Sequence, residues 1–194
     1  MKFVLASSSP RRRELLASIG IDFDVIPSHV PEVHRAGEAP EEYVARLSRD
    51  KAAAIAAGNR ERWVIAADTT VFLDDRLLEK PVDAADAVRM LSAIAGRTHI
   101  VYTGVTIENA EVGYRETRVA ETEVRMLPLS VAEIEWYVAT GEPLDKAGAY
   151  AAQGIGAMFI DSIHGSYTNV VGLPLALLMQ MLRKAGVDPL SFRA

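Results

Sequence analysis

Residues 2–16 of the chain are Lys2-Phe3-Val4-Leu5-Ala6-Ser7-Ser8-Ser9-Pro10-Arg11-Arg12-Arg13-Glu14-Leu15-Leu16. Its apolar first part predicts a short buried strand over 2–6. The hydroxyl-rich part predicts a turn, and the part from Arg11 onward predicts a helix. Ser9 is a suitable N-cap for that helix, and Pro10 is a suitable first residue because its missing N–H costs no hydrogen bond there.

Three consecutive arginines then lie at the positive end of the predicted helix. The helix dipole disfavours a cation there by about 0.3–1 kcal/mol. An anion bound to the free N–H groups of the helix start would reverse that penalty. A solvated basic face is the alternative, and these residues alone leave both open. Because successive helical side chains point about 100° apart, at least one arginine should face solvent.

The composition is that of an ordinary globular protein. The chain has 194 residues, of which 49% are hydrophobic and 24% charged. This length predicts a single domain over residues 1–194. The net charge of −5 argues against bulk nucleic-acid binding, which normally needs a basic face. The absence of cysteine excludes disulfides, thiolate metal sites and cysteine nucleophiles.

No targeting or membrane segment is recognisable in the sequence. The apolar run at the start is too short for a signal peptide. The most apolar later stretch, Gly172 to Leu182, is shorter than the ~20 residues that a membrane span needs. We therefore expect a soluble, cytoplasmic protein without a membrane partner.

Strand-like and helix-like segments alternate along the chain. Strands are predicted over 24–27, 63–67, 69–73, 77–78, 98–108 and 118–127. Helices are predicted over 40–57, from a cap at Asp83 to 95, from a capping box at Ser130 onward, and from Pro174 onward. A last hairpin is predicted over 156–163 and 167–171. Hairpins and helical crossovers together indicate an α/β fold with a mixed sheet.

Asp68 is a candidate for chemistry. It follows the apolar run Val64 to Ala67, which should place it at the end of a buried strand. A carboxylate at a strand end is a common metal ligand or general base. In isolation, a turn or capping role is the simpler interpretation.

Three further polar residues have two interpretations each. Lys51 continues the helical row of Tyr43, Leu47 and Ile55, so its ammonium either snorkels from a core edge or points into a cleft. Lys80 could contact a phosphate or lie in solvent. Gln153, among glycines and alanines, could read a base edge or belong to an ordinary loop.

Several motifs occur in an order that resembles the Maf family of nucleoside triphosphate pyrophosphatases. They are Leu5 to Leu16, Ala67-Asp68-Thr69, Glu79-Lys80-Pro81, Asp145 to Tyr150, Gln153-Gly154 and Gly165 to Leu175. The resemblance extends nearly from end to end. It implies an α/β fold like that of inosine triphosphate pyrophosphatases, in which helices flank a mixed twisted sheet around a deep cleft.

The resemblance also implies roles for individual residues. Asp68 matches the family's proton acceptor. The phosphate-binding turn is matched by Ser7, Arg11 and Arg12. The polar residues of the cleft are matched by Glu32, Lys51 and Lys80. Positions that discriminate between substrates are matched by Arg12, Thr69 and Gln153.

The run Asp145 to Tyr150 with Gln153 is similar to the family branch that acts on dTTP and UTP, whereas a sister branch prefers 7-methyl-GTP. Two departures bear on base preference rather than on the chemistry. Thr70 replaces an apolar residue, and Ala151-Ala152 replaces the commoner Gly-Ile.

The activity that the resemblance implies is hydrolysis between the α- and β-phosphates of a nucleoside triphosphate. Mg²⁺ or Mn²⁺ would be held by Asp68 and Glu32, and Asp68 would orient or deprotonate the attacking water. Two alternatives stay open: a regulator of septum formation that binds nucleotide or nucleic acid without turnover, and a phosphatase that releases inorganic phosphate. No stable nucleic-acid partner is expected, and a homodimer is compatible with the sequence.

Overall fold

The computed structural model describes residues 2–188 and 192. The chain forms two compact units. Unit 1 comprises residues 1–68, 103–120 and 172–194, and unit 2 comprises residues 69–102 and 121–171. Three long strands contribute residues to both: β3 (Trp63–Leu73), β5 (Thr98–Asn109) and β6 (Tyr114–Met126). That the whole chain is one domain stays a prediction.

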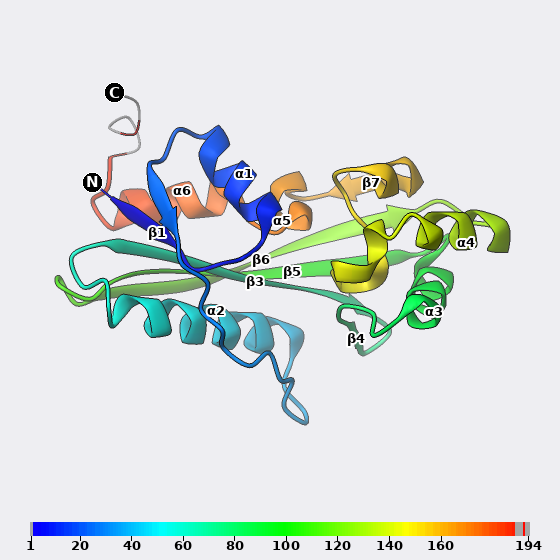
Figure 1. Cartoon of the computed structure of the whole chain (residues 1–194), viewed down its shortest axis with the longest axis horizontal. Helices are drawn as coiled ribbons and strands as arrows, with labels where there is room; N and C mark the ends of the chain where they lie inside the picture. The colour runs from blue at the N-terminus through cyan, green and yellow to red at the C-terminus, as the bar shows by residue number, and fades with distance from the viewer. Residues whose placement is uncertain (1, 189–191, 193–194) are drawn as a thin grey trace. The chain divides into compact units, whose positions relative to one another are not determined.

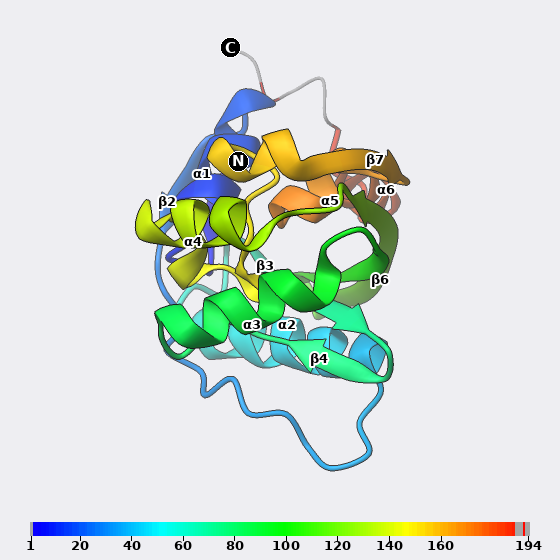
Figure 2. The ribbon, with the colours of Figure 1, turned by 90° about the vertical axis from the view of Figure 1, so that its right-hand side faces the viewer.

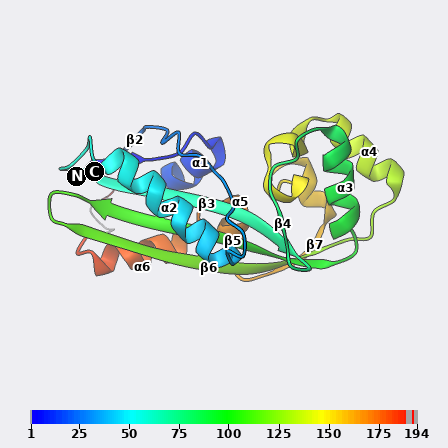
Figure 3. The ribbon, with the colours of Figure 1, turned by 90° about the horizontal axis from the view of Figure 1, so that it is seen from below.

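Unit 1 places helices on both faces of its strands. Its further elements are β1 (Phe3–Leu5), α1 (Pro10–Ser18), β2 (Phe23–Val25), α2 (Pro40–Ala56) and α6 (Leu175–Lys184). β1 pairs in parallel with both β2 and β3. Figure 1 shows α1 and α6 on one side of these strands and α2 on the other, and Figure 3 shows α2 from its own side.

Side-chain alternation divides the core of unit 1 between these two faces. Phe3 and Leu5 of β1 pack with α1 and α6, whereas Val4 and Ala6 pack with α2. The same alternation continues in β3, because its odd-numbered residues 63–67 join the α1/α6 cluster and Val64 and Ala66 join the α2 cluster. Successive strand residues point to opposite faces of the sheet, so every second residue packs on the same side of it.

Unit 2 has a core of its own. Its further elements are β4 (Arg76–Leu78), α3 (Ala84–Ile94), α4 (Val131–Ala139), β7 (Ile160–His164), α5 (Tyr167–Val171) and the short 3₁₀ helices η1 (Glu142–Asp145), η2 (Ala147–Ala149) and η3 (Ile155–Phe159). Leu91, Ile94 and Tyr137 are among its fully buried side chains. Figure 2 shows α3 and α4 next to each other in this unit.

The predicted class of fold is confirmed. The seven strands found in the described residues follow the order β2-β1-β3-β5-β6-β7, and β4 pairs with β3. The pairs of β1 are parallel, whereas β3–β4 and β6–β7 are antiparallel. The sheet is therefore mixed, and helices pack on its strands.

The predicted helix starts are also confirmed. Ser9, Asp83 and Ser130 each accept a hydrogen bond from a backbone N–H in the first turn of the helix that follows, and Ser130 forms a complete capping box with Glu133. A side-chain oxygen at the N-cap satisfies one of the N–H groups that the helix leaves free. These local patterns were sufficient to place α1, α3 and α4.

Two predicted elements were wrong. The strands expected over 63–67 and 69–73 are one continuous strand, so Asp68 lies within β3 rather than at its end. The hairpin expected over 156–171 is instead η3, β7 and the short helix α5. β7 pairs with β6. Ser166 lies between β7 and α5, and its hydroxyl oxygen accepts a hydrogen bond from the N–H of Asn169 in the first turn of α5.

Across the described residues, no helix combines the length and the apolar character that crossing a membrane requires.

Candidate active site

Strand alternation brings Asp68 to α2. Asp68 continues the row of Val64 and Ala66, which packs on α2. Lys51 lies on the buried side of α2, one helical turn before Ile55. The two rows meet, and Lys51 Nζ donates to Asp68 Oδ1 over 2.5 Å, with both side chains buried. The Lys51 ammonium is therefore buried on an acidic partner, so it does not snorkel out to solvent, and that it faces a cleft stays a prediction.

Glu32 reaches the same ammonium from a different segment. It lies in the loop between β2 and α2, which has no helix or strand. Lys51 Nζ donates to Glu32 Oε1, also over 2.5 Å. A single ammonium therefore joins two carboxylates, one buried in a strand and one carried by a loop.

The turn between β1 and α1 adds a second cation. Ser7 is buried, and its Oγ accepts from the Ser9 N–H at 3.2 Å and from Arg12 Nη1 at 3.3 Å. Arg12 Nε donates to the carbonyl oxygen of Gly172 at 2.8 Å. The Arg12 side chain therefore lies over the segment between β1 and α1. Arg13 is exposed, in agreement with the helical spacing, which predicted that at least one arginine faces solvent.

Charge coupling links these groups. Burial raises the pKa of Asp68 above its ordinary value, and the positive charges of Lys51 and Arg12 oppose that shift. Burial lowers the pKa of Arg12, and the carboxylates of Asp68 and Glu32 oppose that shift. Ser7, Arg12, Glu32, Lys51 and Asp68 thus form one cluster within unit 1, which we call the acid–base cluster. Arg11, half-buried in the first turn of α1, adds positive charge beside Arg12.

The acid–base cluster fits a divalent metal ion. Its two carboxylates already converge on one cation, Lys51 Nζ, and carboxylate oxygens are the ligands that Mg²⁺ prefers. No group of three or more His, Cys, Asp or Glu suited to a metal occurs among the residues that the structure describes. Two carboxylates are nevertheless enough where substrate phosphates and waters complete the shell, as is usual for Mg²⁺.

The other predicted substrate residues belong to unit 2. Thr69 follows Asp68 in β3 and is half-buried, whereas Lys80 and Gln153 are exposed. Unit 2 brings their motifs together, because the Gly148 N–H donates to the Glu79 carbonyl at 3.2 Å. Tyr167 OH also donates to the Ala152 carbonyl at 3.3 Å. The roles of Thr69, Lys80 and Gln153 toward a substrate stay predictions.

The segment that carries Gln153 depends on two residues that sequence reasoning missed. Glu142 accepts from the Ile155 and Gly156 N–H groups at 2.9 and 2.8 Å, and from Tyr137 OH at 2.7 Å. Tyr137 OH in turn accepts from the Ala151 N–H at 3.1 Å. In the sequence, Tyr137 shows only helical core spacing, and Glu142 shows no pattern that distinguishes it from a surface carboxylate.

The fold has a counterpart among solved structures. The chain is similar to the Staphylococcus aureus Ham1 protein, with a TM-score of 0.51 and 14% identity, over 95% of this chain and 100% of that one. At this identity the likeness shows the fold alone, and that fold is the mixed α/β architecture expected from the sequence.

The chain belongs to the Maf family, whose description is "Maf-like protein" and which matches residues 2–185. A relative from Myxococcus xanthus, described as a dTTP/UTP pyrophosphatase, is 51% identical over 191 residues, covering 98% of this chain and 95% of that protein. A relative of the same description from Geobacter sulfurreducens is 50% identical over 185 residues, covering 95% of this chain and 97% of that protein.

Proposed function

We propose that this chain hydrolyses dTTP and UTP to the nucleoside monophosphate and pyrophosphate. The observation that carries the proposal is the acid–base cluster, in which Lys51 joins the carboxylates of Glu32 and Asp68 and the charge of Arg12, held on Ser7, acts on both of them. Such a cluster combines groups that bind phosphate with a buried carboxylate suited to activating water. The close relatives described as dTTP/UTP pyrophosphatases support the choice of substrate.

In this reaction a water oxygen bonds to the α-phosphorus of the nucleotide. The bond from that phosphorus to the oxygen bridging it to the β-phosphorus breaks, and pyrophosphate leaves. Asp68 orients the water and accepts its proton. Lys51, Arg12 and the N–H groups at the start of α1 stabilise the charge on the phosphates. No side chain has to form a covalent intermediate.

A divalent cation, Mg²⁺ or Mn²⁺, is part of the proposal. Asp68 and Glu32 would hold it, and it would neutralise charge on the phosphate oxygens. Lys51, which joins these two carboxylates, would add its positive charge to the binding of the phosphates.

A product assay tests the proposal. The purified chain is incubated with Mg²⁺ or Mn²⁺ and with dTTP, UTP, CTP, the purine triphosphates and 7-methyl-GTP. We expect monophosphate and pyrophosphate from dTTP and UTP, with turnover reduced about 10²–10⁴-fold in Asp68→Asn, the usual contribution of a general base. Asp24→Asn is the control, because Asp24 is an exposed carboxylate of the same unit.

Two results would contradict the proposed reaction, and a third would contradict the role of Asp68. Release of inorganic phosphate in place of pyrophosphate identifies a phosphatase. Saturable nucleotide binding without any product identifies a regulator. Undiminished turnover by Asp68→Asn removes Asp68 from the role of base.

A further inference from the structure

The loop between β2 and α2 delivers Glu32 to the acid–base cluster without the support of a helix or strand. Residues 26–39 contain no regular element, and Figure 1 shows the loop extending past the end of α2. The Glu32 side chain is 44% exposed. Burial alone therefore does not hold this carboxylate, and something else must fix the loop if Glu32 is to stay on Lys51.

Arg46 holds the loop at two points. Its guanidinium binds Glu38 in a bidentate manner, with Nε 2.6 Å from Oε1 and Nη2 2.7 Å from Oε2. Nη2 also donates to the carbonyl oxygen of Val33 at 2.9 Å. Val33 directly follows Glu32, so the second contact lies one residue from the carboxylate that meets Lys51. The planar fork of arginine is the side chain suited to making both contacts at once.

Further contacts join residues 33–38 to α2, and one hydrogen bond forms within this segment. The Arg46 guanidinium lies over the Tyr43 ring, 5.6 Å from its centroid, and the His34 ring packs edge-on against that ring at 5.2 Å. The Arg35 N–H donates to Glu38 Oε2 at 3.2 Å. The hydrogen bonds from Arg46 lower the pKa of Glu38 to about 2, so this carboxylate is charged in the neutral range.

We propose that Arg46 is a positioning residue that holds residues 33–38 on α2 and thereby sets the Glu32 carboxylate on Lys51. Arg46 and Lys51 belong to one helix, so the residue that holds the loop and the residue that receives Glu32 share a rigid support. The inference rests on the proposed function, because Glu32 matters to catalysis only if the acid–base cluster hydrolyses nucleotides.

A double-mutant cycle separates positioning from general stabilisation. We measure kcat and KM for dTTP in Arg46→Met, in Glu32→Gln and in the double variant. If Arg46 acts through Glu32, Arg46→Met lowers kcat/KM at least about tenfold alone but less than about twofold further in Glu32→Gln. Losses that multiply in the double variant would overturn the inference. Arg49→Met is the matched control and should be unchanged, because Arg49 is an exposed arginine of α2.

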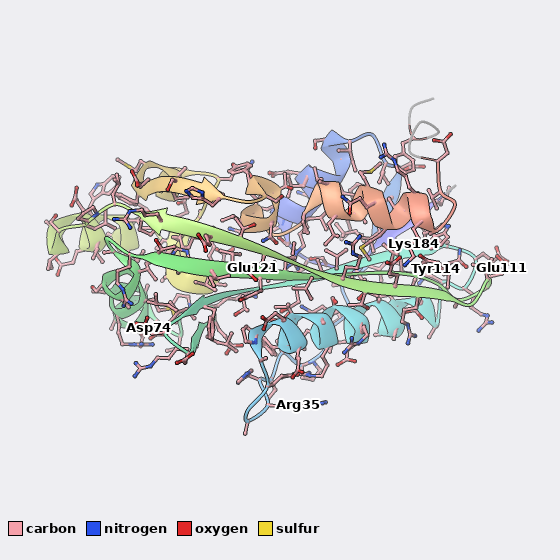
Figure 4. The ribbon with its side chains drawn as sticks, turned by 180° about the vertical axis from the view of Figure 1, so that it is seen from behind. Arg35, Asp74, Glu111, Tyr114, Glu121 and Lys184 are labelled. Carbon is pink, nitrogen blue, oxygen red and sulfur yellow. The ribbon has the colours of Figure 1, made fainter. Side chains whose placement is uncertain are left out.

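Limited trypsin digestion tests the same contacts without any nucleotide. Arg35 is exposed and lies at the tip of the loop in Figure 4, where cleavage after it reports opening of the segment. We expect Arg46→Met to be cut after Arg35 at least about tenfold faster than the native chain and Arg49→Met. Equal rates in all three would show that Arg46 does not hold the loop.

The two experiments distinguish failure of the proposed function from failure of the inference about Arg46. If the native chain hydrolyses no triphosphate, the proposed function fails, and the digestion still decides whether Arg46 holds the loop. If Arg46→Met does not fold, as judged by circular dichroism, Arg46→Lys replaces it in both experiments. Lysine keeps the charge but lacks the fork, so cleavage faster than in Arg49→Met is again expected, and equal cleavage again overturns the inference.

Discussion

Asp68 is as buried as a core residue, although the proposed function requires its carboxylate to be charged as a general base. It is 6% exposed, and burial raises its pKa despite the opposing charges of Lys51 and Arg12. A base must be ionised to accept a proton, so activity should be lost as the pH falls through this raised pKa. We expect the acid limb of the kcat/KM profile, measured at sub-saturating Mg²⁺, above the ordinary Asp value of about 3.9, because bound Mg²⁺ would itself lower the pKa of Asp68.

The pH profile of a second variant checks this assignment. In Lys51→Met the positive charge nearest to Asp68 is lost, so the acid limb of the residual activity should move to still higher pH. A limb that stays in place in Lys51→Met, or that lies below the ordinary Asp value in the native chain, contradicts the assignment.

Lys51 also supports a prediction about metal binding. Lys51→Met leaves the Glu32 and Asp68 carboxylates without the cation that joins them, and breaking a buried ion pair costs about 3–5 kcal/mol. Because the Glu32 side chain is exposed, we expect Lys51→Met to lower the unfolding free energy by an amount at the lower end of this range. Mg²⁺ should restore part of it by taking the place of the ammonium.

Thermal unfolding with and without Mg²⁺ measures this effect independently of activity. The melting temperature of Lys51→Met should rise with Mg²⁺, and the rise should be smaller in Lys51→Met/Glu32→Gln. A melting temperature that does not respond to Mg²⁺ in either variant would show that these carboxylates do not hold the ion.

At the scale of residues, part of the acid–base cluster could be predicted from periodic patterns in the sequence. The alternation of β3 and the i+4 row of α2 are periodic patterns, and they bring Asp68 and Lys51 to the same interface. The partner of Arg12 has no such pattern, because the Gly172 carbonyl lies 160 residues away along the chain. Nor does any local signal in α2 distinguish Arg46, which holds a loop, from Arg49, which is exposed.

At the scale of elements, the position of α2 depends on one residue without a side chain. A Cβ on Gly104 of β5 would lie 2.2 Å from the Val44 carbonyl oxygen and 2.8 Å from the Ala45 backbone nitrogen. Both atoms belong to the backbone of α2, so a rotamer change cannot relieve the contact. Gly104→Ala should push α2, which carries Lys51 and Arg46, away from β5.

We expect Gly104→Ala to lower the unfolding free energy by at least about 1–3 kcal/mol, the range for overpacked cores, and to lower dTTP turnover further than stability alone explains. Denaturant unfolding and kinetics measured below the transition check both effects. Gly58→Ala is the control, since a Cβ there meets nothing within 4 Å. Equal behaviour of the two variants would contradict the close packing of α2 on β5.

Local chemistry explains which elements were predictable. Capping residues and apolar periodicity are read within a few positions, and they placed the starts of α1, α2, α3 and α4 to within a residue or two. The segment 167–171, predicted as a strand of a hairpin, holds β-branched residues, yet it forms α5. There Asn169 donates to the carbonyl of Val101 and to the hydroxyl of Thr122, and these tertiary contacts override the local preference.

At the scale of the whole molecule, the order of elements was accessible from the sequence, whereas strand pairing was not. A mixed sheet follows from hairpins and helical crossovers together. The register, such as Phe3 opposite both Phe23 and Trp63, depends on contacts between distant segments that single-sequence patterns do not encode. Family membership supplies what the local patterns lack, because the ordered motifs span almost the whole chain.

The whole chain should be stabilised by its substrate, since a ligand that binds only the folded state raises the free energy of unfolding. At a dTTP concentration of about 100 times Kd the gain is about 2.7 kcal/mol. For a chain of this length each kcal/mol shifts the melting temperature by about 2–4 °C. Asp68→Asn, whose turnover we expect to be slow, should therefore melt about 5–11 °C higher with dTTP and Mg²⁺. Thymidine at the same concentration should produce a much smaller shift, because the proposed function assigns the binding of the phosphates to Ser7, Arg12 and the start of α1. Equal shifts with dTTP and thymidine would show that the turn between β1 and α1 is not a phosphate site, and Arg12→Met should reduce the dTTP shift if it is.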